Sequence, residues 1–485
     1  MLRKLRIIFA TFFYLCILFL FLDFTGIVQT YIGWIAKMQF IPAFIAVNAV
    51  IIIFLAILTL VCGRIYCSII CPLGITQDII SWLASKRHKN RFTPSKAKNI
   101  LRYPILFIYI VATLLGFGII TALLDPYAAF GRIANQLLQP LWKHTNNLLA
   151  LIAEHFDSYA FYEVDVWLKS ISVLATAILT LIIIVILAWR NGRTYCNTIC
   201  PVGTLLGLLS RFSLFRITID TTKCNSCTLC QRNCKASCID SKAHIVDNSR
   251  CIVCGNCIEK CNKGAINYKL QFASQKAETS SVDTNKRKFI ATATFIAATA
   301  AEAQIKNDGG LAAITNKQAP QRNTRIVPAG AQSENNFLKK CVGCQLCVSA
   351  CPNEVLRPDM MLKPYMSYER GYCRPECTRC SEVCPAGAII RIDKAEKSSI
   401  QIGHAVWIKK NCIPLTDDVE CGNCARHCPS GAITMVPSDP DDASSRKIPV
   451  INEERCIGCG ACENLCPARP FSAIYVEGNE VHRTI

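Results

Sequence analysis

The sequence predicts a membrane α-helical domain, with four spans in internally duplicated hairpins, joined to α+β ferredoxin-like domains. Hydrophobic residues make up 52% of the 485 positions, which is too apolar and too long for one small soluble domain. Most of the 31 cysteines fall in tight C-x2-C-x2-C-x3-C runs, the spacing of metal thiolates rather than of a secreted disulfide framework. The positive-inside rule explains a good part of the formal net charge of +19, so we predict no nucleic-acid partner.

Residues 1–215 are predicted to form a four-helix membrane domain. Crossing roughly 30 Å of hydrocarbon takes about 20 apolar residues, and four stretches reach that length: 7–22 continuing toward 28, 39–63, 103–124 and 170–189. Lysines and arginines precede the first stretch and fill the connection between the second and third, whereas the next connection is acidic. The positive-inside rule therefore places both ends of this domain in the cytoplasm.

An internal repeat follows the second and fourth stretches. Residues 63–74 and 192–203 both read G-R-x-Y-C-x3-C-P-x-G, which indicates duplicated helical hairpins. A C-x3-C pair at a helix end puts both sulfurs on one face. Two such pairs would supply an extra redox or metal site, a seventh centre at the membrane surface, or else thiols that only shape the helix ends; the four cysteines are Cys67, Cys71, Cys196 and Cys200. Cys16 and Cys62 have no partner at useful spacing and are interpreted as small buried hydrophobic residues.

Residues 216–270 contain two complete cluster runs and are predicted to form a cytoplasmic two-cluster ferredoxin. In such domains three thiolates wrap one [4Fe-4S] cube and the fourth crosses to the other cube. Four-cysteine runs with a crossing partner disfavour structural zinc. Cys238 is left over, and its role stays open. The two predicted sets are Cys224, Cys227, Cys230 and Cys261, then Cys251, Cys254, Cys257 and Cys234.

Residues 271–335 are rich in Ala, Ser, Thr, Asn and Gln and are predicted to be a linker. Within it, 286–303 is a basic start followed by a short apolar run, and it resembles a twin-arginine export signal in which Lys286 replaces the first arginine. The alternative is a surface helix that stays in the cytoplasm. We favour export, which would place residues 336–485 in the periplasm.

Residues 336–485 form a predicted four-cluster ferredoxin domain. Four groups of four cysteines each end in Cys-Pro, and proline stops the short helix that follows each loop. Sixteen thiolates fit four cubes, so we expect six [4Fe-4S] clusters in the whole chain. The groups are Cys341, Cys344, Cys347, Cys351; Cys373, Cys377, Cys380, Cys384; Cys412, Cys421, Cys424, Cys428; and Cys456, Cys459, Cys462, Cys466.

Other cofactors are not indicated by the sequence. There is no C-x2-C-H for covalent haem c, and none of the seven histidines lies in a predicted span to ligate haem b. No G-x-G-x-x-G follows a strand, and there is no P-loop. We therefore expect substrate chemistry to take place on another protein, and we assign no catalytic residue.

Residues 1–270 resemble the membrane quinol-dehydrogenase subunit of periplasmic nitrate reductase systems, through their four spans, two repeated motifs and two-cluster tail. Residues 286–485 resemble the periplasmic four-cluster ferredoxin partner of that subunit, so the two are joined in one chain. The resemblance implies that group one pairs with group four and group two with group three. The implied sets are Cys341, Cys344, Cys347 and Cys466; Cys456, Cys459, Cys462 and Cys351; Cys373, Cys377, Cys380 and Cys428; and Cys412, Cys421, Cys424 and Cys384.

The resemblance implies a quinol dehydrogenase subunit of anaerobic respiration, lying in a bacterial inner membrane, that relays electrons from menaquinol or ubiquinol to a periplasmic reductase or cytochrome. Nitrate and nitrous oxide reductases both remain open as acceptors. An accessory factor for metal reduction or oxidase maturation is the alternative from another class. Asp125 and Arg132, just beyond the third span, are candidates for the quinone site. The competing interpretation, which the sequence favours, is that they are interfacial anchors.

Overall fold

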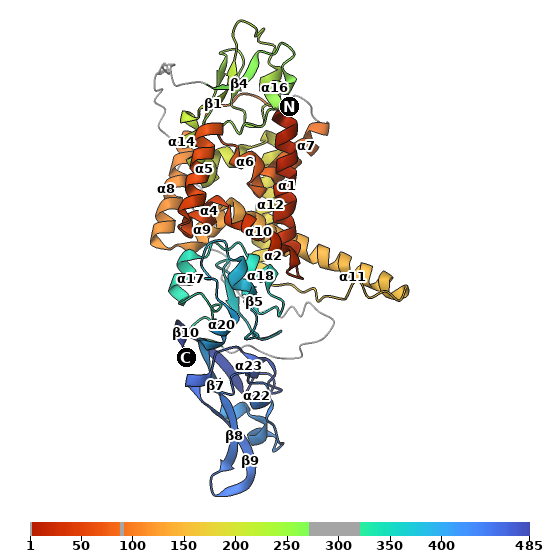
Figure 1. Cartoon of the computed structure of the whole chain (residues 1–485), viewed down its shortest axis with the longest axis vertical. Coiled ribbons are helices and arrows are strands. Elements are labelled where there is room, and N and C mark those ends of the chain that lie inside the picture. Colours follow the sequence, from red (N-terminus) through yellow and green to blue (C-terminus); the bar gives the residue numbers. More distant parts are fainter. Residues whose placement is uncertain (1, 88–91, 271–320) are drawn as a thin grey trace.

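The computed structural model describes residues 2–87, 92–270 and 321–485. A helical bundle occupies the middle of an elongated molecule, with the ferredoxin of residues 216–270 at one end and residues 321–485 at the other (Figure 1). The predicted export-like segment 286–303 lies outside the described residues.

Two helices of the bundle are long and apolar enough to cross a membrane. These are α1 (Leu2–Leu22) and α12 (Ile171–Asn191), each of 21 residues. Two shorter apolar helices, α5 (Ala49–Cys62) and α8 (Asn99–Leu115), occupy the regions of the second and third predicted spans. The helical prediction holds for all four regions, and two of them reach full spanning length.

The other predicted spans are interrupted, which corrects their expected boundaries. The second splits into α4 (Phe40–Ile45) and α5 at Val47, whose φ of 53° is left-handed, and at Asn48, whose side chain accepts the Ile51 N–H at 3.3 Å. The third splits at Gly116, with φ of 79°, into α8 and α9 (Gly118–Leu124). The first ends at Leu22 rather than continuing toward residue 28.

Asp23 ends the first helix by turning the chain. Its carboxylate accepts N–H groups from Thr25, Gly26 and Gln29 at 2.7–3.1 Å, which satisfies the donors of the following turn and starts α2 (Ile27–Ile32).

Short helices close the bundle and position its functional side chains. Aromatic rings pack at the contact of α1 with α10 (Pro126–Ile133), where the ring centroid of Phe21 lies 5.8 Å from that of Tyr127 and 6.1 Å from that of Phe130. The remaining helices here are α3 (Trp34–Lys37), α6 (Tyr66–Ile69), α7 (Pro72–Arg87), α10 (Pro126–Ile133), η1 (Ala134–Leu138), α11 (Gln139–His155), α13 (Thr194–Thr198), α14 (Pro201–Leu209) and η2 (Ser210–Phe212).

The ferredoxin of residues 216–270 contains two antiparallel strand pairs, one of them within the loop between the strands of the other. Strand β1 (Phe215–Ile219) pairs with β4 (Ile266–Leu270), with Ile217 opposite Tyr268. Between them lie α15 (Leu229–Arg232), β2 (Ile239–Asp240), β3 (Ile245–Val246) and α16 (Asn256–Lys260), and β2 pairs with β3. The cysteine loops therefore lie between β1 and β4 along the chain.

The C-terminal domain has two halves joined by a returning strand. β10 (Ile474–Thr484) pairs with β7 (Ile400–Trp407), so the end of the chain lies beside the middle of the domain. The other elements are α17 (Glu334–Lys340), α18 (Leu346–Ala350), β5 (Leu356–Pro358), β6 (Pro364–Met366), α19 (Arg379–Val383), α20 (Lys394–Ser399), η3 (Lys409–Asn411), α21 (Ile413–Thr416), α22 (Asn423–Arg426), β8 (Ile433–Asp439), β9 (Asp442–Ile451), η4 (Glu453–Arg455) and α23 (Ala461–Asn464).

Candidate metal centres

The two repeated motifs bring four buried thiols together inside the bundle. Cys71 precedes α7 and Cys200 precedes α14, and the Cys200 sulfur accepts the N–H of Gly203 at 3.4 Å. Cys71 and Cys200 each lie within electrostatic range of both Cys67 and Cys196. The structure therefore brings all four residues of the predicted extra site together.

Each motif arginine crosses to the other motif. Arg193 donates from Nη1 to the Cys67 carbonyl at 2.8 Å, and Arg64 donates from Nη2 to the Cys196 carbonyl at 3.2 Å. Each guanidinium also lies 3.8 Å from a sulfur, Arg64 from Cys67 and Arg193 from Cys196. Each motif arginine therefore holds the C-x3-C segment of the other motif through a backbone hydrogen bond.

Buried positive charge surrounds these thiols. The Asp78 carboxylate binds three cations, Arg193 at 2.8 Å, Arg6 at 2.7 Å and Lys235 at 3.3 Å. Arg64 has no carboxylate within 4 Å among the described residues; it donates to the side-chain oxygen of Asn197 at 2.8 Å and to the Ser249 carbonyl at 3.1 Å. An unbalanced buried cation is costly. Deprotonated cysteines holding an anionic centre would balance this charge.

The ferredoxin of residues 216–270 places its cysteines in two crossing sets. Cys261 and Cys224 both lie within electrostatic range of Cys230, and Cys234 lies within range of Cys257. These neighbours belong to the sets proposed from the spacing. The leftover Cys238 is buried, with its sulfur 3.5 Å from that of Cys234. The structure thus puts a fifth thiol beside one set.

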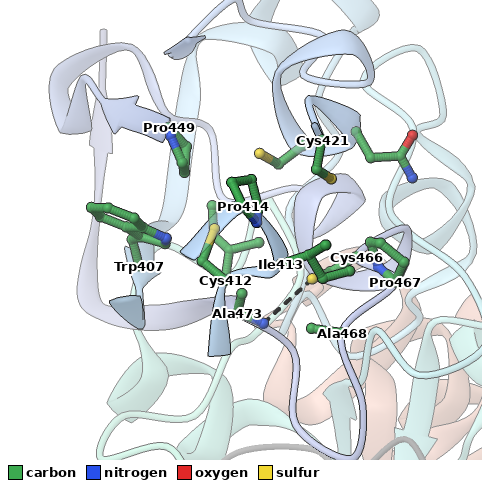
Figure 2. Close-up of a pocket in the computed structure, with 13 residues that line it drawn as sticks. Trp407, Cys412, Ile413, Pro414, Cys421, Pro449, Cys466, Pro467, Ala468 and Ala473 are labelled. Atoms are coloured by element: carbon green, nitrogen blue, oxygen red, sulfur yellow. Dashed lines mark hydrogen bonds between the residues drawn. The ribbon is translucent and has the colours of Figure 1, made fainter. Parts of the chain in front are cut away.

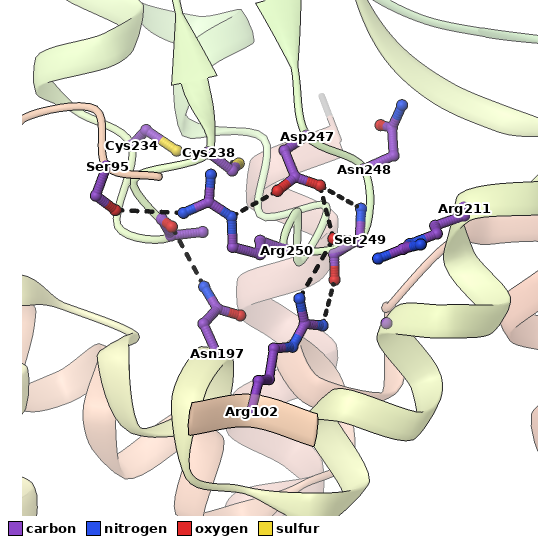
Figure 3. Close-up of polar contacts among 12 residues, drawn as sticks. Ser95, Arg102, Asn197, Arg211, Cys234, Cys238, Asp247, Asn248, Ser249 and Arg250 are labelled. Atoms are coloured by element: carbon purple, nitrogen blue, oxygen red, sulfur yellow. Dashed lines mark hydrogen bonds and ion pairs between the residues drawn. The ribbon is translucent and has the colours of Figure 1, made fainter. Parts of the chain in front are cut away.

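Polar contacts seat this ferredoxin on the bundle, as Figure 3 shows. Arg102 of α8 donates to the Ser249 carbonyl at 3.1 Å, and Asn197 donates to the Ala236 carbonyl at 3.2 Å. Arg250 reaches Ser95 at 3.2 Å. These contacts, together with the pairing of Lys235 and Asp78, hold the loop that carries Cys234 against the bundle.

In the C-terminal domain, four cysteines line one pocket. Figure 2 shows Cys412 and Cys421 with Cys466 in its wall, and Cys424 lines it as well. The Cys466 sulfur accepts the N–H of Ala473 at 3.3 Å. A second pocket is lined by Cys351, Cys373, Cys377 and Cys380.

The remaining cysteines of this domain gather in two further sets. Cys384 lies within electrostatic range of Cys341, Cys344 and Cys347. Cys428 lies within range of Cys456 and Cys459, which are also neighbours of Cys462. Numbered outward from the bundle, the set that contains Cys384 is the first, that of Cys351 the second, that of Cys428 the third and that of Cys412 the fourth.

This geometry corrects the pairing that the resemblance implied. The structure joins group one with group two and group three with group four, so Cys466 belongs with Cys412 and Cys384 with Cys341. The physical reason is local: the β5–β6 hairpin returns the chain from group one to group two, and the β8–β9 hairpin returns it from group three to group four. Closing such short loops costs less entropy than joining the ends of the domain.

Each of these sets offers four cysteine sulfurs, which is the donor set of a [4Fe-4S] cube. Among the described residues, no group of three or more His, Cys, Asp and Glu side chains is close enough to hold one metal ion. In a [4Fe-4S] cube each thiolate binds a different iron, so the four sulfurs stand farther apart than around one ion. A wall of four thiols around a shared pocket is the donor set that such a cube requires.

The quinone-site candidates lie deep in the protein, so they are not anchors exposed at an interface. Asp125 and Arg132 are both fully buried, 0% exposed. The Asp125 Oδ1 accepts the Tyr127 N–H at 3.0 Å, and Arg132 donates to the Ala122 carbonyl at 2.7 Å. Five buried polar atoms here have no hydrogen-bond partner among the described residues: Asp125 Oδ2, Arg132 Nε, Arg132 Nη2, Tyr109 OH and Tyr127 OH.

This polar cluster lies between the four-thiol site and the C-terminal domain. Tyr195 is within electrostatic range of Cys200 on one side and of Asp125 on the other. Cys344 is within range of Asp125 as well. Sequence reasoning missed Tyr109 and Tyr127, because a single tyrosine in an apolar helix carries no signal of a buried polar cluster.

Hydrogen bonds fix the first cysteine group of the C-terminal domain on the bundle. Asn135 donates to the Gln345 carbonyl and Gln136 to the Gln345 side chain, both at 3.0 Å. Lys143 pairs with Glu354 at 3.1 Å. These hydrogen bonds and this ion pair therefore fix the position of Cys344 relative to Asp125.

Families that bind iron-sulfur clusters match most of these regions. Residues 340–388 and 419–469 match a family described as a 4Fe-4S dicluster domain, and residues 247–355 match another family of that description. Residues 44–90 and 173–220, which hold the two repeats, match a 4Fe-4S binding domain. No solved structure matches the chain.

Several ferredoxin-type proteins are relatives of this chain. The chain is 32% identical to the ferredoxin-type protein NapG of Escherichia coli, over 33% of this chain and 77% of that protein. It is 25% identical to the ferredoxin-type protein NapH of Haemophilus influenzae, over 46% of this chain and 67% of that protein. It is 31% identical to the methylamine utilization ferredoxin-type protein MauM of Paracoccus denitrificans, over 32% and 73%. The chain is therefore an iron-sulfur electron-transfer protein and belongs to the Nap-type polyferredoxin family.

Proposed function

We propose that this chain takes electrons from menaquinol or ubiquinol in a bacterial inner membrane and relays them to a periplasmic reductase or cytochrome. The observation that carries the proposal is the buried cluster of Asp125 and Arg132, which lies against the first cysteine set of the C-terminal domain. A [4Fe-4S] cube held by such a set supplies one-electron chemistry. The membrane position rests on the apolar helices and on the likeness to NapH.

The cysteine sets follow one another from the bundle to the far tip of the molecule. Cys347 of the first set is within range of Cys380 of the second. The Cys373 N–H of the second set donates to the Cys459 carbonyl of the third at 2.9 Å. Cys462 of the third is within range of Cys424 of the fourth. The protein thus holds four sites in series, which keeps each transfer distance short.

The unpaired atoms around Asp125 suit a quinol headgroup. A quinol hydroxyl donates one hydrogen bond and accepts another, and the free Oδ2 of Asp125 and free Nη2 of Arg132 offer the matching acceptor and donor. Oxidation to the quinone releases two protons and two electrons: the Asp125 carboxylate would accept the protons one at a time, and the electrons would pass singly to a one-electron cube at the first set. The phenols of Tyr109 and Tyr127 supply further polar contacts in the same cluster.

The four-thiol site is proposed to hold a seventh centre. Its sulfurs lie between the ferredoxin of residues 216–270 and the Asp125 cluster, and surplus buried cations favour an anion there. The two cysteine-rich domains lie at opposite ends of the bundle (Figure 1), which supports a cytoplasmic position for residues 216–270 and a periplasmic one for residues 336–485.

Anaerobic addition of a menaquinol analogue to the purified protein tests the function. We expect the EPR signals of reduced clusters to appear with the quinol alone, with dithionite as the positive control. The variant D125N should lose reduction by quinol and keep reduction by dithionite. The matched control D165N changes an exposed carboxylate in the same half of the chain and should behave like the wild type.

The results separate two functional classes. Reduction by dithionite but never by quinol, in the wild type, would contradict the quinol relay and support an accessory factor that reduces a metal or matures an oxidase. Equal quinol reduction in the wild type and D125N would keep the relay and reject the Asp125 site.

A further inference from the structure

Lys397 is a buried cation bonded to a cysteine sulfur. It lies on α20, which begins where the Asp393 side chain accepts the Glu396 N–H at 2.6 Å. Its Nζ donates to the Cys373 Sγ at 3.2 Å and to the Arg374 carbonyl at 2.7 Å. A third bond goes to the Cys377 carbonyl. The side chain is only 6% exposed.

These three bonds use all the donors of an ammonium group. No carboxylate lies within 4 Å of this Nζ in the part of the chain that the structure describes. The Cys373 sulfur, once deprotonated, is therefore the anion that this buried charge faces. Lysine is rarely buried unless it is paired, so the contact with Cys373 is what makes its position favourable.

Lys397 lies at the junction between the two halves of the C-terminal domain. Cys373 belongs to the second cysteine set, and its N–H donates to the Cys459 carbonyl of the third set at 2.9 Å. Lys397 itself lines the pocket that Cys351, Cys373, Cys377 and Cys380 share. By contrast, the buried Lys363 near Cys341 directs its Nζ to the Leu338 carbonyl rather than to a sulfur.

We propose that Lys397 raises the reduction potential of the cube held by Cys351, Cys373, Cys377 and Cys380, and so makes the second set the preferred resting place of an electron before it crosses to the third. This inference rests on the proposed function, because it assumes that these cysteines hold a cube. Reduction adds one negative charge to the cube and its ligands. A fixed positive charge bonded to a ligand sulfur stabilises the reduced form more than the oxidised form.

A redox titration of the full-length protein, followed by EPR, measures this effect. In K397M one component of the titration should move to lower potential. We expect the ratio of oxidised to reduced cube at a fixed potential to rise roughly tenfold, which is about 59 mV for a one-electron couple. The matched control is K394M, which removes an exposed lysine of the same helix and should leave the titration unchanged.

Iron and acid-labile sulfide are measured on every sample. A shifted component with unchanged iron supports the proposal, and an unshifted titration with unchanged iron overturns it. If K397M loses about four iron atoms per chain, K397Q is titrated in its place, because glutamine keeps a hydrogen-bond donor but not the charge. An unshifted K397Q titration would also overturn the proposal. A wild-type protein that lacks iron in this domain would instead refute the proposed function.

Discussion

At the level of single residues, His482 shows how burial shapes the pH dependence of this chain. It lies on β10, the strand that joins the two halves of the C-terminal domain. Neither ring nitrogen has a hydrogen-bond partner among the described residues. Burial lowers the pKa of His482 to about 4, because a charged imidazolium would lose its hydration there.

We therefore expect the C-terminal domain to lose stability as the pH falls from about 6.5 toward 4. In this range the unfolded state binds a proton at residue 482 and the folded state does not, so protonation favours unfolding. Thermal unfolding measured between pH 7 and pH 5 should show a smaller decrease in Tm for H482Q than for the wild type. The control H144Q, which changes an exposed histidine of α11, should follow the wild type. Parallel curves for H482Q and the wild type would contradict this role.

At the level of elements, the last glycine of each repeated motif lets two helices close on each other. A Cβ at Gly74 would lie 2.4 Å from the Cys67 carbonyl oxygen and 2.6 Å from Nη1 of Arg193. A Cβ at Gly203 would lie 2.1 Å from the Cys196 carbonyl oxygen and 2.8 Å from Nη2 of Arg64. The crossing arginine and the small residue are therefore two parts of one contact.

Replacement of either glycine by alanine should loosen the four-thiol site. We expect G74A and G203A each to lower the free energy of unfolding by about 1–3 kcal/mol, the usual effect of overpacking. Thermal unfolding in detergent measures the change. In G422A the new Cβ meets only Met435 Cγ at 4.0 Å, so this variant serves as the control. Wild-type stability in both motif variants would contradict this role of the glycines, because the cysteine carbonyls and the arginines would both have moved aside.

The sequence predicted the elements better than their boundaries. Apolar length indicated four helical regions, and all four are helical. The break at Gly116 had a visible signal, but the left-handed Val47 did not, because valine rarely adopts that conformation. In the same way, spacing predicted the 24 cysteines of the six sites, whereas the pairing of the sixteen in the C-terminal domain depended on where the β5–β6 and β8–β9 hairpins return the chain.

At the scale of the whole molecule, neighbouring buried polar groups extend from the ferredoxin of residues 216–270 through the bundle to the C-terminal domain. Lys235 beside Cys234 contacts Asp78, Asp78 binds Arg193, and Arg193 contacts the Cys67 carbonyl. Beyond the thiols follow the tyrosines and Asp125, then Cys344. No sequence pattern joins residues so far apart in the chain, so this continuity emerges only when the two repeats pack against each other.

The iron content of the purified protein tests whether the four-thiol site is a metal centre. Six cubes contain about 24 iron atoms and seven contain about 28. We expect the anaerobically purified wild type to contain about 28 per chain. The double variant C67S/C196S should retain about 24, because it removes one thiol from each motif and leaves the other sets intact. The control C16S changes a cysteine outside every set and should retain the full amount. A wild type with about 24 iron atoms, unchanged in C67S/C196S, would mean that these thiols only shape the helix ends.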